Sequence, residues 1–319
     1  MWGWWTRPRP KAWAPLGAAQ TLLVVAGKVP VGESGILYAV GRASAIGLAP
    51  GAPVVMVADG VDAMLADEMP AARLAELIGT TVDWQPPRSL LTLAARQRIA
   101  QAEVTAVCDA VAMLGWHRTN AFSGVDGTPS MPTGLPGRRR TLSSGRSIYP
   151  RIDPVAIVLC ESADGLRCLL GRSVKYPRGM YTCISGFVEH AEQVEAAAAR
   201  ELVEETGVRC GPVRLVASQP WPCGRGGTCE LMLACAARAA DGCEEINVSG
   251  GSTDGSGELE DARWFTREEV LQMVELQPGA GGAVPPSFAI AHQMITKWAR
   301  REPEWPTFEA PHEVVSSML

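Results

Sequence analysis

Hydrophobic and polar residues alternate in short, strand-like runs near the start of the sequence. Three apolar runs, TLLVV, ILYAV and PVVMVAD, lie between residues 21 and 59 and are separated by turns rich in glycine and proline. Residues 69–79 have the spacing of a short amphipathic helix, and the periodicity from Leu90 to Trp116 predicts a long one. This half of the sequence predicts a small strand-rich domain followed by a connecting helix.

A second series of strands begins after Tyr149. DPVAIVLCES and LRCLLGRS predict a hairpin, and VRLVASQPW, TCELMLACAA and ELEDARWF predict three further strands. Helices are expected at EQVEAAAARELVEETG, with Gly207 as its stop, at TREEVLQMV, which opens with a Thr–x–x–Glu capping box, and at PPSFAIAHQMITKWAR. This mixed order predicts an α/β (α+β) sandwich rather than a regular βαβ array.

Changes in composition suggest the domain boundaries. The sequence predicts a flexible N-terminus at 1–20, an N-terminal mixed α/β domain at 21–88, a connecting helix and a Ser-, Gly-, Pro- and Arg-rich segment at 89–147, a second domain at 148–300 and a tail at 301–319.

Composition and charge narrow the class of protein. The 319 residues are 47% apolar, which is enough for the cores of two domains. The net charge of −5 gives no global basic field for nucleic acid. The nine cysteines are odd in number and include no CxxC pair, which favours a reducing compartment over a disulfide framework. No apolar run approaches the length of a membrane span, so no membrane partner is expected.

One segment is crowded with acidic residues. GFVEHAEQVEAAAARELVEETGV, residues 186–208, holds six glutamates and one arginine. On a helix, Glu201, Glu204 and Glu205 fall at i, i+3 and i+4, so their carboxylates converge and repel one another. A solvated acidic face explains this composition but not the spacing of the flanking glycines. A site for a hard cation such as Mg²⁺ would relieve the repulsion.

The spacing of this segment decides between these interpretations. It reads Gly186, five residues, Glu192, seven residues, Arg200-Glu201-Leu202, one residue, Glu204-Glu205, one residue and Gly207-Val208. This resembles the Nudix box GX5EX7REUXEEXGU, in which U is aliphatic, at every specified position. The resemblance implies a Nudix αβα sandwich that hydrolyses a nucleoside diphosphate linked to another group with Mg²⁺ or Mn²⁺. Glu201, Glu204 and Glu205 would be metal ligands, with Glu204 or Glu205 as base, and Glu192 would pair with Arg200.

Residues outside the box resemble the NADH pyrophosphatase branch of that superfamily. The matching motifs are SQPWP (218–222), YPRIDP (149–154), WHRTNAF (116–122) and PPSFAIAH (285–292). The resemblance implies hydrolysis of NAD(H)-like dinucleotides to AMP and nicotinamide mononucleotide by a homodimer. It further implies Glu258 as an additional catalytic and metal-binding glutamate, and substrate-binding roles for Tyr149, Phe187, Met232 and Ala291. For Phe187, Met232 and Ala291, plain core packing is the competing interpretation.

The sequence departs from this family at the zinc ribbon between the two halves. The four cysteine ligands of that ribbon are replaced by Ser123, Asp126, Thr141 and Ser144, so no structural zinc is expected. Dimer packing or the run Arg138–Arg140 would then hold the segment. The same run, with Arg146 nearby, is also the basic cluster that a groove for RNA would need, and the competing interpretation of it is a solvated loop. Glu230 and the altered residues 223–229 leave open which dinucleotide is preferred.

Other functions remain compatible with the sequence. Removal of NAD caps from RNA uses the same chemistry and needs a basic groove beside the pocket, whereas ADP-ribose and coenzyme A are substrates of other Nudix enzymes. The lost zinc ligands also raise the possibility of a non-enzymatic scaffold, against which the intact box argues. The final residues Ser317-Met318-Leu319 resemble a peroxisomal signal; cytoplasm, or a mitochondrion or chloroplast reached through the basic N-terminus, are the alternatives.

Overall fold

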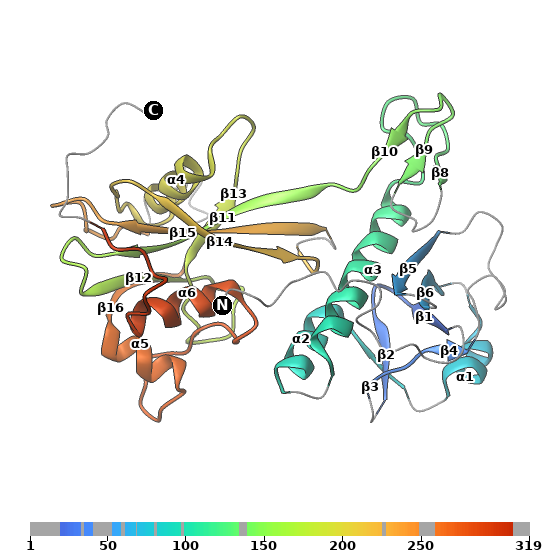
Figure 1. Cartoon of the computed structure of the whole chain (residues 1–319), viewed down its shortest axis with the longest axis horizontal. Coiled ribbons are helices and arrows are strands. Elements are labelled where there is room, and N and C mark those ends of the chain that lie inside the picture. The colour runs from blue at the N-terminus through green and yellow to red at the C-terminus, as the bar shows by residue number, and fades with distance from the viewer. Residues whose placement is uncertain are drawn as a thin grey trace. The chain divides into compact units, whose positions relative to one another are not determined.

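The computed structural model describes two compact units. One consists of residues up to Ile152 together with Trp221–Glu230, and the other of Asp153–Pro220 together with the residues from Leu231 onward (Figure 1). The structure describes residues 20–32, 35–40, 53–58, 61–67, 69–79, 82–96, 99–133, 139–224, 228–248 and 259–308. Glu258, Arg138, the N-terminal twenty residues except Gln20, and the Ser-Met-Leu tail therefore lie outside the described residues.

The first unit begins with two small sheets. One has the strand order β4-β1-β6-β5, from β4 (Ala39–Val40), β1 (Gln20–Val24), β6 (Val61–Leu65) and β5 (Val54–Ala58). The other has the order β3-β2-β7, from β3 (Gly35–Ile36), β2 (Val29–Gly32) and β7 (Asp83–Gln85). Helix α1 (Ala71–Ile78), at the predicted place, packs Leu74, Leu77 and Ile78 against buried Leu23 and Met64.

The helical stretch after this domain is two helices, so the prediction of one long helix from Leu90 to Trp116 is wrong. Helix α2 (Pro87–Ala95) starts at a proline, which is compatible with the first helical turn, and α3 (Gln101–Thr119) starts after an extended Ala100. The two helices pack against each other and bury the apolar residues Leu90, Leu91, Val104, Val107 and Leu114. A single straight helix could not fold its own halves together in this way.

The segment that resembles a zinc ribbon is tied to α3 by Arg140. Its short strands β8 (Met131–Pro132), β9 (Arg140–Thr141) and β10 (Ser147–Ile148) form a sheet of order β10-β9-β8. The Arg140 side chain, 5% exposed, donates to Ser130 Oγ at 2.6 Å, to the Ser130 carbonyl at 2.6 Å and to the His117 carbonyl at 3.3 Å. The interpretation of Arg138–Arg140 as a solvated loop is therefore wrong for Arg140.

Hydroxyl groups join the two turns that contain the four positions of the zinc ligands in the resembling family, Ser123 and Asp126 in one turn and Thr141 and Ser144 in the other. Thr128 Oγ1 donates to Asp126 Oδ1 at 2.8 Å and lies 2.9 Å from Ser143 Oγ in the second turn. Thr133 Oγ1 and Thr141 Oγ1 are 2.6 Å apart across the strands. These hydrogen bonds and Arg140 hold the segment in this structure, and the expectation that no zinc is bound remains a prediction.

The second unit is a three-layer αβα sandwich, which confirms the predicted fold class. Its six-stranded sheet has the order β14-β15-β11-β12-β16, and β13 pairs with β11. The strands are β11 (Ile152–Glu161), β12 (Arg167–Arg172), β13 (Ile184–Phe187), β14 (Arg214–Trp221), β15 (Cys229–Arg238) and β16 (Asp261–Thr266). The predicted hairpin of β11 and β12 is confirmed, with Cys160 opposite Leu169.

Strand β11 is buried on both sides because helices cover both faces of the sheet. Ala156 and Val158 pack with Leu202 of α4 (Val194–Thr206), whereas Ile157 and Leu159 pack with the cluster under α5 (Arg267–Val274) and α6 (Ile290–Ala299). The continuous apolar run VAIVLC follows from this double cover. Helix α5 opens with the predicted capping box between Thr266 and Glu269. No helix in the described part of the chain is long and apolar enough to span a bilayer.

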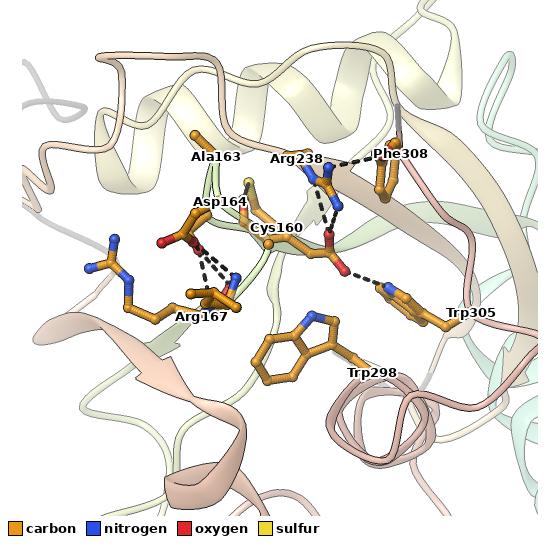
Figure 2. A network of polar contacts seen from close by, with 12 residues as sticks. Cys160, Ala163, Asp164, Arg167, Arg238, Trp298, Trp305 and Phe308 are labelled. Atoms are coloured by element: carbon orange, nitrogen blue, oxygen red, sulfur yellow. Dashed lines mark hydrogen bonds and ion pairs between the residues drawn. The ribbon is translucent and has the colours of Figure 1, made fainter. Parts of the chain in front are cut away.

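A buried carboxylate fastens the last described residues to the sheet. Glu161, 3% exposed, accepts hydrogen bonds from Arg238 Nη2 at 2.8 Å and from Trp305 Nε1 at 3.0 Å. Arg238 also donates to the Phe308 carbonyl at 2.9 Å, so Arg238, Trp305 and Phe308 gather around one point (Figure 2). The charge of Glu161 is paired in this way, which burial of a carboxylate requires.

Candidate active site

The glutamate-rich segment contains the predicted helix, α4, which follows the end of β13 and a loop. Helix α4 begins after Gln193 and ends at Gly207, whose left-handed conformation (φ +74°) lets its N–H bond to the Val203 carbonyl at 2.9 Å. Ala197, Ala198 and Leu202 on one side of α4 are fully buried against the sheet. Glu204 is exposed and Glu205 is half-buried, whereas Glu201 is buried where the helix meets β13.

Arg200 connects the loop to the polar face of this helix. Its guanidinium binds both oxygens of Glu192, at 2.8 and 3.0 Å, and the Phe187 carbonyl at 2.9 Å. The expected Glu192–Arg200 ion pair is therefore present. Hydrogen bonds from Arg200 lower the pKa of the Glu192 carboxyl, and its acidic partners raise the pKa of Arg200. The loop that begins at Phe187 and the helix are consequently held as one body.

Two of the four predicted metal ligands lie close enough to share one cationic atom. Nη1 of Arg200 is 2.7 Å from Glu201 Oε1 and 2.9 Å from Glu204 Oε2. This positively charged nitrogen lies between the two carboxylates. Two carboxylate oxygens that converge on one positive charge also fit a hard cation, which prefers such ligands. Glu205 lies half-buried on the same helix. Within the described residues, no group of three His, Cys, Asp or Glu side chains closes around a metal position.

Gly186 explains how the Glu201 carboxyl reaches its position. Glu201 is only 9% exposed, and its carboxyl group lies directly against the α-carbon of Gly186 in β13. A β-carbon at residue 186 would overlap the carboxyl carbon and both oxygens, closer than the 3.0 Å that real side chains respect. Gly186 pairs with Ala156 of the central strand β11, so it cannot easily move aside. Gly186, which opens the motif, therefore leaves free the space that the Glu201 carboxyl occupies. We call this position the seat of Glu201.

The predicted substrate-binding residues have different surroundings. Phe187 is 41% exposed at the end of β13, and Tyr149, in the other unit, is 64% exposed. Met232 is half-buried against the core beneath α6, and Ala291 is buried in that core at 4% exposure. The roles of these four residues, and the catalytic role of Glu258, remain predictions.

Sequence reasoning missed the conformation of Ala191. This residue precedes Glu192 and has φ +63°, a left-handed conformation that favours glycine. The loop therefore carries a small conformational strain beside the Glu192–Arg200 pair.

Comparison with known families identifies this unit. Residues 150–285 match the NUDIX domain model. These residues form a NUDIX domain. The match begins just before β11 and ends before α6, and it includes the whole Gly186–Val208 motif. The resemblance drawn from the motif spacing is thus confirmed.

Relatives of the NUDIX domain in this chain carry names that refer to NAD-containing substrates. The human NAD-capped RNA hydrolase NUDT12 is 38% identical over 214 residues, 65% of this chain and 44% of that protein. The human mitochondrial NAD(P)H pyrophosphatase NUDT13 is 36% identical over 202 residues, which are 60% of this chain and 54% of that protein. NAD-capped RNA hydrolase NudC of Mycobacterium bovis is 36% identical over 202 residues, which are 61% of this chain and 60% of that protein. The chain spans about half the length of the curated relatives it matches.

Proposed function

We propose that this chain is a metal-dependent diphosphatase that hydrolyses the pyrophosphate bond of NAD(H)-like dinucleotides to AMP and nicotinamide mononucleotide. The observation that carries the proposal is the arrangement around Arg200, in which Glu201 and Glu204 share one cationic atom on a NUDIX helix. The names of the relatives support NAD-containing dinucleotides as the substrate class.

Each residue of the motif has a separable task in this proposal. Mg²⁺ or Mn²⁺, held by Glu201, Glu204 and Glu205 together with Glu258, would offset diphosphate charge and lower the pKa of a bound water. Gly186 fixes the Glu201 carboxyl, and the Glu192–Arg200 pair fixes the loop that leads to the helix. Glu204 or Glu205 accepts the proton of the attacking water. Phe187, exposed at the end of β13, offers a ring surface for the substrate.

The central test is substitution of a motif carboxylate. Glu205→Gln keeps the shape of the side chain but removes its charge, so turnover of NADH should fall by about 10²-fold or more while the fold is kept. Glu258→Gln should also reduce turnover. A substrate panel of NADH, NADPH, ADP-ribose and coenzyme A, assayed in Mg²⁺ and in Mn²⁺, would identify the preferred substrate. Near wild-type turnover by Glu205→Gln would refute the assigned site, and inactivity on every substrate would favour a scaffold.

A second candidate function is removal of NAD caps from RNA. The names of two relatives, which are both NAD-capped RNA hydrolases, favour it. The bond that breaks is the same pyrophosphate bond, so the test is release of nicotinamide mononucleotide from NAD-capped RNA, with free NADH as reference. A much lower kcat/KM on the capped RNA than on NADH would argue for the free dinucleotide.

We also propose that the protein is a homodimer. The segment around the ribbon exposes several large apolar side chains. They are Phe122 (65% exposed), Val125 (86%), Met131 (54%), Tyr149 (64%) and Ile152 (59%). A second copy of the chain would cover them. Light scattering should give twice the monomer mass, and a monomer that stays fully active on dilution would contradict the proposal.

A peroxisomal location is proposed from Ser317-Met318-Leu319. The names of two relatives, one mitochondrial and one chloroplastic, support an organelle as the alternative. A fluorescent protein fused ahead of residue 1 leaves Leu319 free. Its distribution should change when the last three residues are removed, and an unchanged distribution outside peroxisomes would contradict the signal.

A further inference from the structure

A basic, partly aromatic loop follows β12, and we propose that it binds the RNA strand of a NAD-capped substrate. We call residues 173–179, with the sequence SVKYPRG, the basic loop. Together with the preceding Arg172, it holds three cations and no acid in a chain whose net charge is −5. This inference rests on the proposed function, because it names the chain that would be attached to the dinucleotide.

The tip of the basic loop is exposed while its base is fixed. Lys175 and Arg178 are exposed, and Val174 and Tyr176 are 71% and 39% exposed. At the base, the Ala283 N–H donates to the Gly179 carbonyl at 2.8 Å, and Thr182 and Gly171 exchange two hydrogen bonds of 2.9 Å. The loop is therefore presented to solvent from an ordered stem.

The two cations at the tip of the loop, Lys175 and Arg178, do not stabilise the described part of the fold through ion pairs. Neither Lys175 nor Arg178 has an ion-pair partner among the described residues. Arg172, by contrast, pairs with Glu260 at 2.9 Å, and Arg263 of the neighbouring strand pairs with Asp261 at 2.7 Å. Cations that neutralise phosphates account for most sequence-independent affinity for nucleic acids.

Two arginines, each paired with an acidic residue, lie beside the stem of the loop. Arg172 and Arg263 lie over the ring of Tyr181, with guanidinium carbons 5.7 and 5.8 Å from the ring centroid. The Arg263 side chain is 61% exposed. Exposed Tyr176 adds a ring on which a base can stack, as in other proteins that bind single-stranded nucleic acid. Phosphate charge and base stacking are therefore both matched.

The stem of the loop continues directly into the strand that carries Gly186. After the stem at Thr182 the chain runs through β13, where Gly186 holds the Glu201 carboxyl. Four residues of extended chain span about 13 Å. Gly171 at the other side of the stem lies against Ile184 of β13. A dinucleotide bound at the carboxylates would thus have the basic loop within reach of the first nucleotides that follow it.

The experiment measures three quantities in each variant: kcat/KM on NAD-capped RNA, kcat/KM on NADH and NADPH, and binding of the same RNA without its cap. Lys175→Ala/Arg178→Ala should lower kcat/KM on NAD-capped RNA about tenfold and leave NADH hydrolysis unchanged. The slope of log kcat/KM against log salt should become less steep by about 0.7 for each lost phosphate contact. Tyr176→Ala should weaken binding of the same RNA without its cap about fivefold, as read by fluorescence anisotropy, and Tyr176→Phe should keep it.

Control variants separate the outcomes. Arg209→Ala/Arg301→Ala removes two exposed cations of the same unit outside the basic loop and should leave all three measurements unchanged. An equal loss with this control, or no loss on capped RNA with the loop variant, would overturn the inference. A loss on NADPH alone would assign the cations to a ribose phosphate instead. Failure of the wild type to cleave NADH would refute the proposed function rather than the loop.

Discussion

Substitution of Gly186 tests whether the position of the Glu201 carboxyl matters for catalysis. In Gly186→Ala the new β-carbon would lie inside the 3.0 Å limit of real contacts to the carboxyl carbon and both oxygens. Gly186 is paired with Ala156 in the sheet, so the strand resists movement and the glutamate must withdraw instead. Restoring ordinary contact requires a shift of about 1 Å or more, and misplacement on that scale can cost about 10²-fold in rate.

We therefore expect Gly186→Ala to lose about 10²-fold in kcat for NADH and to bind Mn²⁺ at least about tenfold more weakly. Electron paramagnetic resonance of free Mn²⁺ measures the second quantity without turnover. Gly211→Ala is the matched control, because the nearest atom to its new β-carbon is 4.0 Å away. Wild-type Mn²⁺ affinity and rate in a folded Gly186→Ala protein would refute the assignment of Gly186 as the seat of Glu201.

Three further predictions concern stability. Ala191→Gly should raise the free energy of unfolding by about 0.5–1 kcal/mol, because glycine relieves the positive φ, and chemical denaturation measures it. Arg140→Met should lower that free energy by about 3 kcal/mol, since Ser130 loses two donors in a buried place, whereas Arg140→Lys should lose less. Arg200 lowers the pKa of Glu192 below its ordinary value of 4.5, so the stabilisation is complete above pH 4.5 and is lost as the pH falls through the lowered pKa. Glu192→Gln should flatten this acid dependence, and an unchanged slope would contradict the pairing.

The structure of the motif was predictable because it depends mainly on residues that are close together in the sequence. Spacing along one helix places Glu201 and Glu204 on one side, and Gly207 ends the helix through its own backbone conformation. The same spacing could not show that the Glu201 carboxyl lies against Gly186, because that contact depends on how β13 meets the helix. Nor could it reveal the positive φ of Ala191, which follows from the closure of the loop.

The connecting region was harder to predict, since its structure depends on distant contacts. The apolar pattern from Leu90 to Trp116 is compatible with one helix or two, and packing of α2 on α3 decides between them. Three consecutive arginines suggest a solvated loop, yet the exposure of Arg140 is set by Ser130 and His117. Strand β11 shows no alternation because both of its faces are buried, yet it was predicted correctly as the first strand of a hairpin.

The hydrogen-bonded ribbon has a consequence for the conditions under which the protein keeps its shape. Thiolates at zinc are vulnerable to peroxide and to competing chelators, whereas hydroxyl and guanidinium groups are not. With Ser123, Asp126, Thr141 and Ser144 at the four positions, we expect the segment's integrity to be independent of metal supply and of oxidants. The same segment should tolerate substitution of Arg140 poorly, because its guanidinium has to fit one particular set of acceptors.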